Sequence, residues 1–216
     1  MQVRVWDLPV RIFHWVLVAL LLFQVVSGKI GGSLIEWHLY CGYAVFVLVV
    51  FRVLWGFAGS TSARFASFLV KPAAALSFGA RLLSRRAETY AGHNPLGGWM
   101  VIALLVSLAL QVGTGLFSND GISTDAPLAA LVSIEVSDLL TDLHRLNFWV
   151  VVLLAAVHTA AALYHWLALK EDLIGAMFTG VKRLHAHETT AIFVSSWRAL
   201  LVFAFALAAV WVVVTV

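Results

Sequence analysis

Five long apolar segments constrain the fold of this chain more than any other feature of its sequence. They cover about residues 11–27, 36–57, 96–117, 143–169 and 197–216. Each is long enough to cross about 30 Å of hydrocarbon as an α-helix that rises about 1.5 Å per residue. Backbone amides find no water in lipid, so a spanning segment has to satisfy its own hydrogen bonds, as a helix does. We therefore expect an all-α integral membrane bundle.

The composition excludes several other classes of protein. Of the 216 residues, 62% are hydrophobic and 12% are charged, whereas soluble domains carry about 25% charged residues. The single cysteine, Cys41, excludes an internal disulfide and any cysteine-based zinc or iron–sulfur site. The net charge of +3 is small and unevenly spread, which indicates membrane topology and no nucleic-acid partner.

The distribution of charge predicts how the bundle is oriented. The segment 59–92 contains five basic residues and one acid, Glu88, whereas 118–142 contains five acids and no lysine or arginine. Basic loops stay in the cytoplasm. We expect the amino terminus and the basic segment inside, the acidic segment outside, and a multi-pass protein of the bacterial inner membrane. Lys71-Pro72 predicts a short helix at the inner surface, with proline in its first turn.

Histidines within the apolar segments carry the candidate chemistry. His144 and His158 lie 14 residues apart in one segment, so they return to within about 40° of one helix face and are separated by about 21 Å along the axis. Imidazoles in a membrane helix face the bundle interior and need a partner. One helix can thus offer an axial ligand near each membrane surface.

Each of these ligands needs a partner at the same depth. His38, at the outer end of the second segment, matches His144, and His14 lies at the inner end of the first segment. His165 follows His158 by seven residues, about 20° away on the same face, so spacing leaves open which of the two faces His14. Four imidazoles at two depths predict two six-coordinate b-type haems, which carry electrons because no coordination position is open.

Two further residues are candidates for cofactor binding. Arg52 follows His38 by 14 residues on the same face, and its guanidinium could either anchor the helix at the membrane surface or pair with a haem propionate. Gly42 lies one turn after His38 and could allow the macrocycle, or a neighbouring helix, to approach the backbone. We expect His93 to structure its loop, and His185 and His187 to lie in a solvated linker.

Several short motifs occur together in the first 183 residues, namely VWDLPVRIFHW (5–15), FRVLWGF (51–57), GHNPLGGWM (92–100), YHW (164–166) and KEDL (170–173). With them, the chain resembles bacterial cytochrome b-561 proteins and the related b-type cytochrome subunit of nickel–iron hydrogenases. The resemblance implies four axial ligands on the first, second and fourth helices, two of them on the fourth. Carried over, these are His14, His38, His144 and His158, so the resemblance favours His158 over His165.

The resemblance also implies a four-helix core. We expect a di-haem domain over residues 1–183, a linker over 184–196, and an additional transmembrane helix over 197–216 that packs outside the core or mediates assembly. The expected function is electron transfer across the membrane, between the quinone pool and a redox protein such as a c-type cytochrome.

Three other functions are compatible with the sequence. The chain could anchor a hydrogenase or another oxidoreductase as its cytochrome subunit, or it could oxidise quinol alone and pass electrons to superoxide or another small acceptor. It could also be a haem-free transporter or scaffold with structural histidines. The sequence allows a homo-oligomer.

Overall fold

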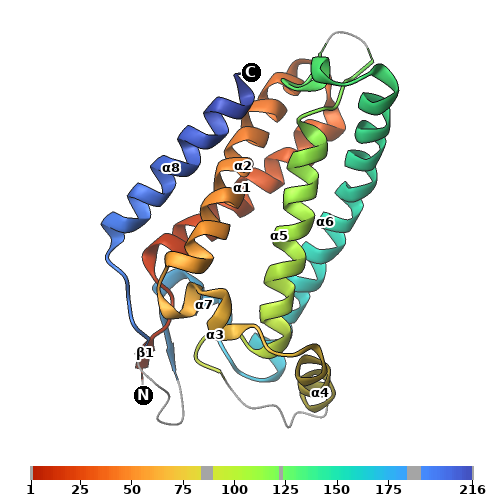
Figure 1. The fold of residues 1–216 in the computed structure, drawn as a ribbon. Helices are drawn as coiled ribbons and strands as arrows, with labels where there is room; N and C mark the ends of the chain where they lie inside the picture. Colours follow the sequence, from red (N-terminus) through yellow and green to blue (C-terminus); the bar gives the residue numbers. More distant parts are fainter. Residues whose placement is uncertain (1, 84–89, 122–123, 184–190, 216) are drawn as a thin grey trace.

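The long helices define the architecture. In the computed structural model, which describes residues 2–83, 90–121, 124–183 and 191–215, five helices are long and apolar enough to cross a membrane. They are α1 (Leu8–Ile30), α2 (Ile35–Ala58), α5 (Pro95–Gly115), α6 (Ile134–Ala168) and α8 (Ser196–Val214). All five lie roughly along one axis, and the chain reverses direction from each to the next (Figure 1). The expected all-α membrane bundle is confirmed.

Short elements occupy the ends of the bundle. They are α3 (Phe65–Phe68), α4 (Pro72–Leu83), α7 (Leu173–Thr179), the 3-10 turns Gly32–Leu34, Thr61–Ala63 and Ala129–Leu131, and the strands β1 (Gln2–Arg4) and β2 (Val181–Arg183). α4 is the helix expected after Lys71, and it lies across the bundle axis (Figure 1). The basic residues expected at Arg85 and Arg86, and the linker histidines His185 and His187, lie outside the described residues.

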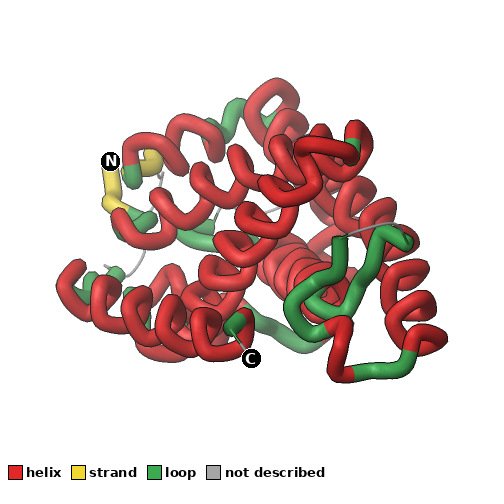
Figure 2. The backbone as a smooth tube through the Cα atoms, turned by 90° about the horizontal axis from the view of Figure 1, so that it is seen from above, coloured by secondary structure: helices red, strands yellow, loops and turns green. Residues whose placement is uncertain are grey.

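Two features differ from the sequence-based expectation. β1 and β2 pair antiparallel, with Val3 opposite Lys182, beside the amino terminus (Figure 2). The fourth long helix begins at Ile134, about nine residues earlier than the apolar segment suggests. Its added turns mix polar and apolar residues and are held by the loop that follows α5, because Asn119 donates from its backbone N–H to Thr141 and from its side chain to Ser137.

Local signals explain how the helices begin and turn. Asp7 caps α1, since its carboxylate accepts a hydrogen bond from the Val10 amide at 2.9 Å, and Asn94 caps α5 in the same way through Gly97 at 2.7 Å. Both caps precede a proline in the first turn, where a missing N–H costs nothing. α1 and α2 are joined, at the end of the bundle opposite β1, through Gly31, whose φ of 63° favours glycine.

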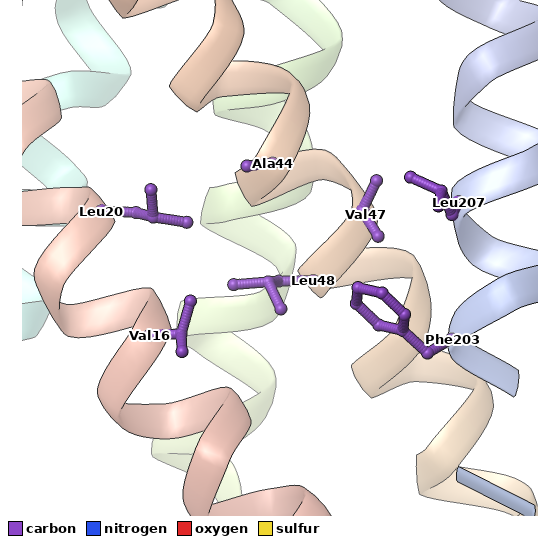
Figure 3. A pocket seen from close by; sticks show the side chains of 7 residues that line it. All are labelled: Val16, Leu20, Ala44, Val47, Leu48, Phe203 and Leu207. Carbon is purple, nitrogen blue, oxygen red and sulfur yellow. The ribbon is translucent and has the colours of Figure 1, made fainter. Parts of the chain in front are cut away.

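Helix packing divides the bundle into two parts. One part is α5 with α6, the other is α1, α2 and α8, and they meet where α2 contacts α5. α5 packs on α6, α1 packs on α2, α2 also contacts α5, and α8 covers another side of α2. An apolar cavity of about 180 Å³ lies between α1, α2 and α8 (Figure 3). Only aliphatic and phenyl side chains line it, so it offers no ligand for a metal. α6 faces α1 and α2 across the bundle, since its histidines lie opposite histidines of both helices.

Candidate functional site

We call the end of the bundle with β1, β2, α3 and α4 the inner end, and the opposite end the outer end, after the orientation expected from the sequence. The histidines at the inner end face each other. His14 lies in the second turn of α1 and His158 lies in the last third of α6. Their ring centres are 6.3 Å apart, with an angle of 56° between the ring planes. His165, the other candidate partner of His14, makes different contacts, which are described below.

The outer end contains a second pair with the same spacing. His38, near the start of α2, faces His144 of α6, and their ring centres are also 6.3 Å apart. Lys29 of α1 lies over the rings of Phe148 and Trp149 of α6 at 4.8 and 4.7 Å. This contact ties α1 to α6 close to the outer histidine pair.

The spacing in both pairs fits axial ligation of one metal ion by two imidazoles. A metal–imidazole bond is about 2 Å long, and an imidazole nitrogen lies about 1.2 Å from its ring centre, so two rings on opposite sides of one metal have centres about 6 Å apart. Among the described residues, no cluster of three or more His, Cys, Asp or Glu could hold a metal ion directly. Paired imidazoles without further protein ligands suit an iron whose other four ligands come from a porphyrin.

Both outer imidazoles contact neighbouring helices through hydrogen-bonding groups that the sequence analysis did not identify. His38 Nδ1 is 3.0 Å from the hydroxyl of Ser27 on α1, and His144 Nδ1 is 2.8 Å from the backbone carbonyl of Gln111 on α5. A Cβ at Gly28 would lie 3.0 Å from His38, and one at Gly115 would lie 2.9 Å from His144. The glycines thus allow each ring to lie against a helix backbone.

A buried polar ladder supports His144 within the apolar part of the bundle. Gln111 donates to the His144 carbonyl and accepts from Asn147, at 3.1 and 2.7 Å. Asn147 in turn bonds both the hydroxyl and the carbonyl of Ser107. Polar side chains in the membrane interior that satisfy one another fix the register of two helices. The sequence contained a sign of this ladder, because Gln111 and Asn147 are amide side chains inside apolar segments.

The inner end contains buried cationic and polar atoms without partners among the described residues. Arg52 is only 3% exposed, its guanidinium lies 5.2 Å from the Phe65 ring centre, and its Nη1 has no hydrogen-bond partner. The Nδ1 atoms of His14 and His93 also lack partners. Asp7 supplies a nearby negative charge, but a buried cationic nitrogen without a hydrogen bond is costly, so an anionic group such as a haem propionate fits this end. A membrane anchor would reach the surface, and this buried guanidinium does not.

His93 lies in the loop before α5 and packs between two rings, as a loop-structuring residue would. Its ring centre is 4.7 Å from that of Trp6 and 4.5 Å from that of Phe68. Burial and the nearby charge of Arg52 lower the pKa of His93 to about 3. The ring is therefore neutral at physiological pH.

His165 takes part in a separate buried network. Its Nδ1 is 2.6 Å from the Glu171 carboxylate, and its Nε2 is 3.5 Å from the Asn94 side chain. Glu171 also binds Lys182 of β2. The structure thus places His158, and not His165, opposite His14.

Gly42 contacts α1. A Cβ there would lie 3.3 Å from the side-chain nitrogen of Gln24. The close approach involves a flexible side chain, so this contact supports helix packing at Gly42 and leaves its expected role toward a macrocycle untested.

Comparison with known families adds to this geometry. Residues 5–180 match the family model described as prokaryotic cytochrome b561. The chain belongs to this family. The match covers four of the long helices and both histidine pairs, and it ends before α8. The b561 family assignment implies a b-type haem, so the chain is a membrane b-type cytochrome that takes part in electron transfer.

Individual relatives point the same way. Proteins named "Probable Ni/Fe-hydrogenase B-type cytochrome subunit" from Rhodobacter capsulatus and Bradyrhizobium diazoefficiens are each 24% identical to this b561 protein. The alignments cover 83% and 84% of the chain and 80% and 86% of the relatives. The protein of that name from Azotobacter vinelandii is also 24% identical. No solved structure gave a significant match.

Proposed function

We propose that the protein carries electrons across the bacterial inner membrane through two b-type haems, each held by two histidines. The observation that carries this proposal is the presence of two facing imidazole pairs with ring centres 6.3 Å apart. His14 and His158 would hold the inner haem, and His38 and His144 the outer one. When bound, each haem would accept and release one electron at a time.

The protein's own residues would keep this chemistry selective. Two imidazoles per iron leave no open coordination position, which disfavours oxygen binding. The outer hydrogen bonds orient His38 and His144, and Arg52 would pair with a propionate at the inner end. Gly42 would allow close approach at the α1–α2 interface. The di-haem core would comprise residues 1–183, with a linker over 184–196 and α8 as a separate addition.

The electron donors and acceptors we propose are the quinone pool and a redox protein. The outer end of α6 carries Glu135, Asp138 and Asp142, which would suit an electropositive partner such as a c-type cytochrome. A second candidate function is that of a membrane-anchoring subunit of a hydrogenase or other oxidoreductase, which the names of the relatives favour. Purification from the native membrane would distinguish the two, since only the second predicts a stably associated oxidoreductase.

The test is the visible spectrum and the haem-to-protein ratio of the purified protein and its single-histidine variants. We expect two low-spin haems in the wild type. Replacement of His14 or His158 by alanine should remove one haem, and replacement of His38 or His144 should remove the other, because the pairs are about 21 Å apart along α6.

His165→Ala is the matched control on the same helix and should retain both haems, since both nitrogens of its ring are engaged elsewhere. Loss of a haem in His165→Ala, with both retained in His158→Ala, would show that the inner pairing is wrong. A purified protein without a haem spectrum would overturn the proposed function itself.

A further inference from the structure

The two histidine pairs differ in what lies behind their imidazoles. Each outer ring has an oxygen next to Nδ1, from Ser27 for His38 and from the Gln111 carbonyl for His144. At the inner end, His14 Nδ1 is buried and has no partner among the described residues. The asymmetry arises from helix packing, since Ser27 and Gln111 lie on helices adjacent to those that carry the histidines.

The hydrogen-bond directions are fixed at His144. A backbone carbonyl can only accept, so His144 Nδ1 must carry the proton and donate it to Gln111. The Gln111 side-chain nitrogen lies 3.1 Å from His144 Nε2 and donates to its lone pair, a hydrogen bond that a metal bound at Nε2 would replace. Nε2 is therefore the nitrogen able to bind a metal.

The same direction follows at His38 through a relay. Ser27 is fully buried, and its hydroxyl lies 3.4 Å from the Gln24 carbonyl, to which it can donate. The oxygen of Ser27 is then free to accept the Nδ1 proton of His38 at 3.0 Å. The relay from His38 through Ser27 to Gln24 leaves Nε2 of His38 unprotonated. Gly28, the next residue, provides the space in which the ring lies against α1.

We infer that Ser27 is a positioning residue that fixes His38 as an axial ligand and, with the Gln111 carbonyl behind His144, makes the outer iron the harder of the two to reduce. This inference rests on the proposed haem pairing. A hydrogen bond from Nδ1–H to an oxygen makes an imidazole a stronger electron donor, which stabilises the oxidised iron. His14 lacks such an acceptor, and the buried Arg52 cation at the inner end, whose Nη1 has no partner among the described residues, favours the reduced form there.

The experiment is a spectroscopic redox titration of the purified holoprotein, with haem content measured on the same samples. In the wild type we expect two components. Ser27→Ala should raise the potential of the lower component, or weaken retention of that haem, and leave the higher component unchanged. Ser27→Thr keeps the hydroxyl and should restore wild-type behaviour. Thr159→Ala is the control, because the Thr159 hydroxyl donates to its own helix on an exposed face next to His158, and it should shift neither component.

The outcomes separate the inference from the function on which it rests. Two retained haems with an unchanged lower component in Ser27→Ala, or a shift in the higher component instead, would overturn the inference and leave the haem pairing intact. If Ser27→Ala does not fold, Ser27→Cys decides by the same criteria, since a thiol has similar size but accepts hydrogen bonds weakly. A wild-type protein without two low-spin haems would overturn both.

Discussion

Arg52 illustrates how one buried side chain can report on a cofactor. Its guanidinium is enclosed between α2 and the Phe65 ring, and one of its nitrogens has no partner among the described residues. A cation in that position is stabilised by an anionic propionate, and it favours the reduced iron because reduction lowers the local positive charge. Arg52 follows His38 by 14 residues, about 21 Å along α2, so we expect its effect to fall on the inner haem and not on the outer one.

Replacing Arg52 should therefore act on the inner haem alone. We expect Arg52→Leu to lower the potential of the His14/His158 haem by about 59 mV, which is a tenfold change in a one-electron reduction equilibrium. Alternatively, the variant should retain this haem more weakly. Arg52→Lys should retain part of the effect. A redox titration with assigned components checks this, and an unchanged titration of Arg52→Leu would show that the guanidinium has only a packing role.

The network around Glu171 makes a prediction about pH. Burial alone would raise the pKa of Glu171, but the hydrogen bonds from His165 and Lys182 outweigh it and hold the pKa below its ordinary value of 4.5. A carboxylate with a depressed pKa stabilises the fold above the pKa of the unfolded state and loses this effect as pH falls through its folded value. The stabilisation should be complete at neutral pH and disappear below about pH 4.5.

Glu171→Gln should thus cost about 2–4 kcal/mol of unfolding free energy at pH 7, because it leaves Lys182 buried without its counterion. The difference from the wild type should shrink as the pH falls below 4.5. Unfolding in mixed micelles, followed by circular dichroism, measures both quantities. Glu135→Gln is the matched control, since Glu135 is exposed at the other end of α6; an equal effect in the two variants would contradict the network's role.

Among the elements, α8 is the helix that the family match does not include. Its inward face meets α2 through small residues, with Ala199 and Ala206 in the shared core cluster, and Phe203 lies 6.0 Å from Phe51 of α2. None of the four paired histidines is on α8. Its packing against the outside of α2 supports the proposal that it lies beside the haem core.

Overpacking this helix interface should reduce stability without removing a haem. Ala206 is fully buried, so Ala206→Leu should cost about 1–3 kcal/mol. Ala204→Leu adds the same side chain on the exposed face of α8 and should have little effect. Unfolding in mixed micelles and the haem-to-protein ratio check the two halves of the prediction. Loss of a haem in Ala206→Leu alone would place α8 within the haem core.

At the scale of the whole molecule, the two ends of the bundle differ in charge. The loop between α5 and α6 and the first turns of α6, which carry Asp125, Glu135 and Asp138, lie at one end of the bundle (Figure 1). The opposite end holds the amino terminus with α3, α4 and β2 (Figure 1), and the basic residues there are Arg64 before α3, Lys71 before α4 and Lys182 in β2. The two termini lie at opposite ends, as five crossings require. Because basic loops stay in the cytoplasm, the charge difference supports our proposal that the amino terminus is cytoplasmic.

Cysteine labelling in intact cells tests this orientation. In a Cys41→Ser background, Ser133→Cys precedes α6 at the acidic end and should react with an impermeant thiol reagent from outside. Ser77→Cys on α4, at the basic end, should react only after the membrane is made permeable. Both serines are exposed. The reverse pattern of labelling would invert the proposed topology and exchange the inner and outer haems.

The sequence by itself determined the class of fold and the candidate ligands. Apolar run length is sufficient to locate membrane helices, because lipid forces the backbone to bond internally. The helical period alone places His144 and His158 on one face. Periodicity could not predict the first turns of α6, because those turns depend on hydrogen bonds from Asn119 in the loop before the helix, and a helical period does not report such contacts.

Tertiary structure decided what periodicity left open. His158 and His165 lie on nearly the same face of α6, so only the placement of α1, and the engagement of His165 by Glu171 and Asn94, put His158 opposite His14. Ser27 and Gln111 could not be related to the outer histidines before the helices were packed. A single helix specifies direction and spacing along its own axis, whereas the partner of a side chain is set by the position of a second helix, which local sequence does not encode.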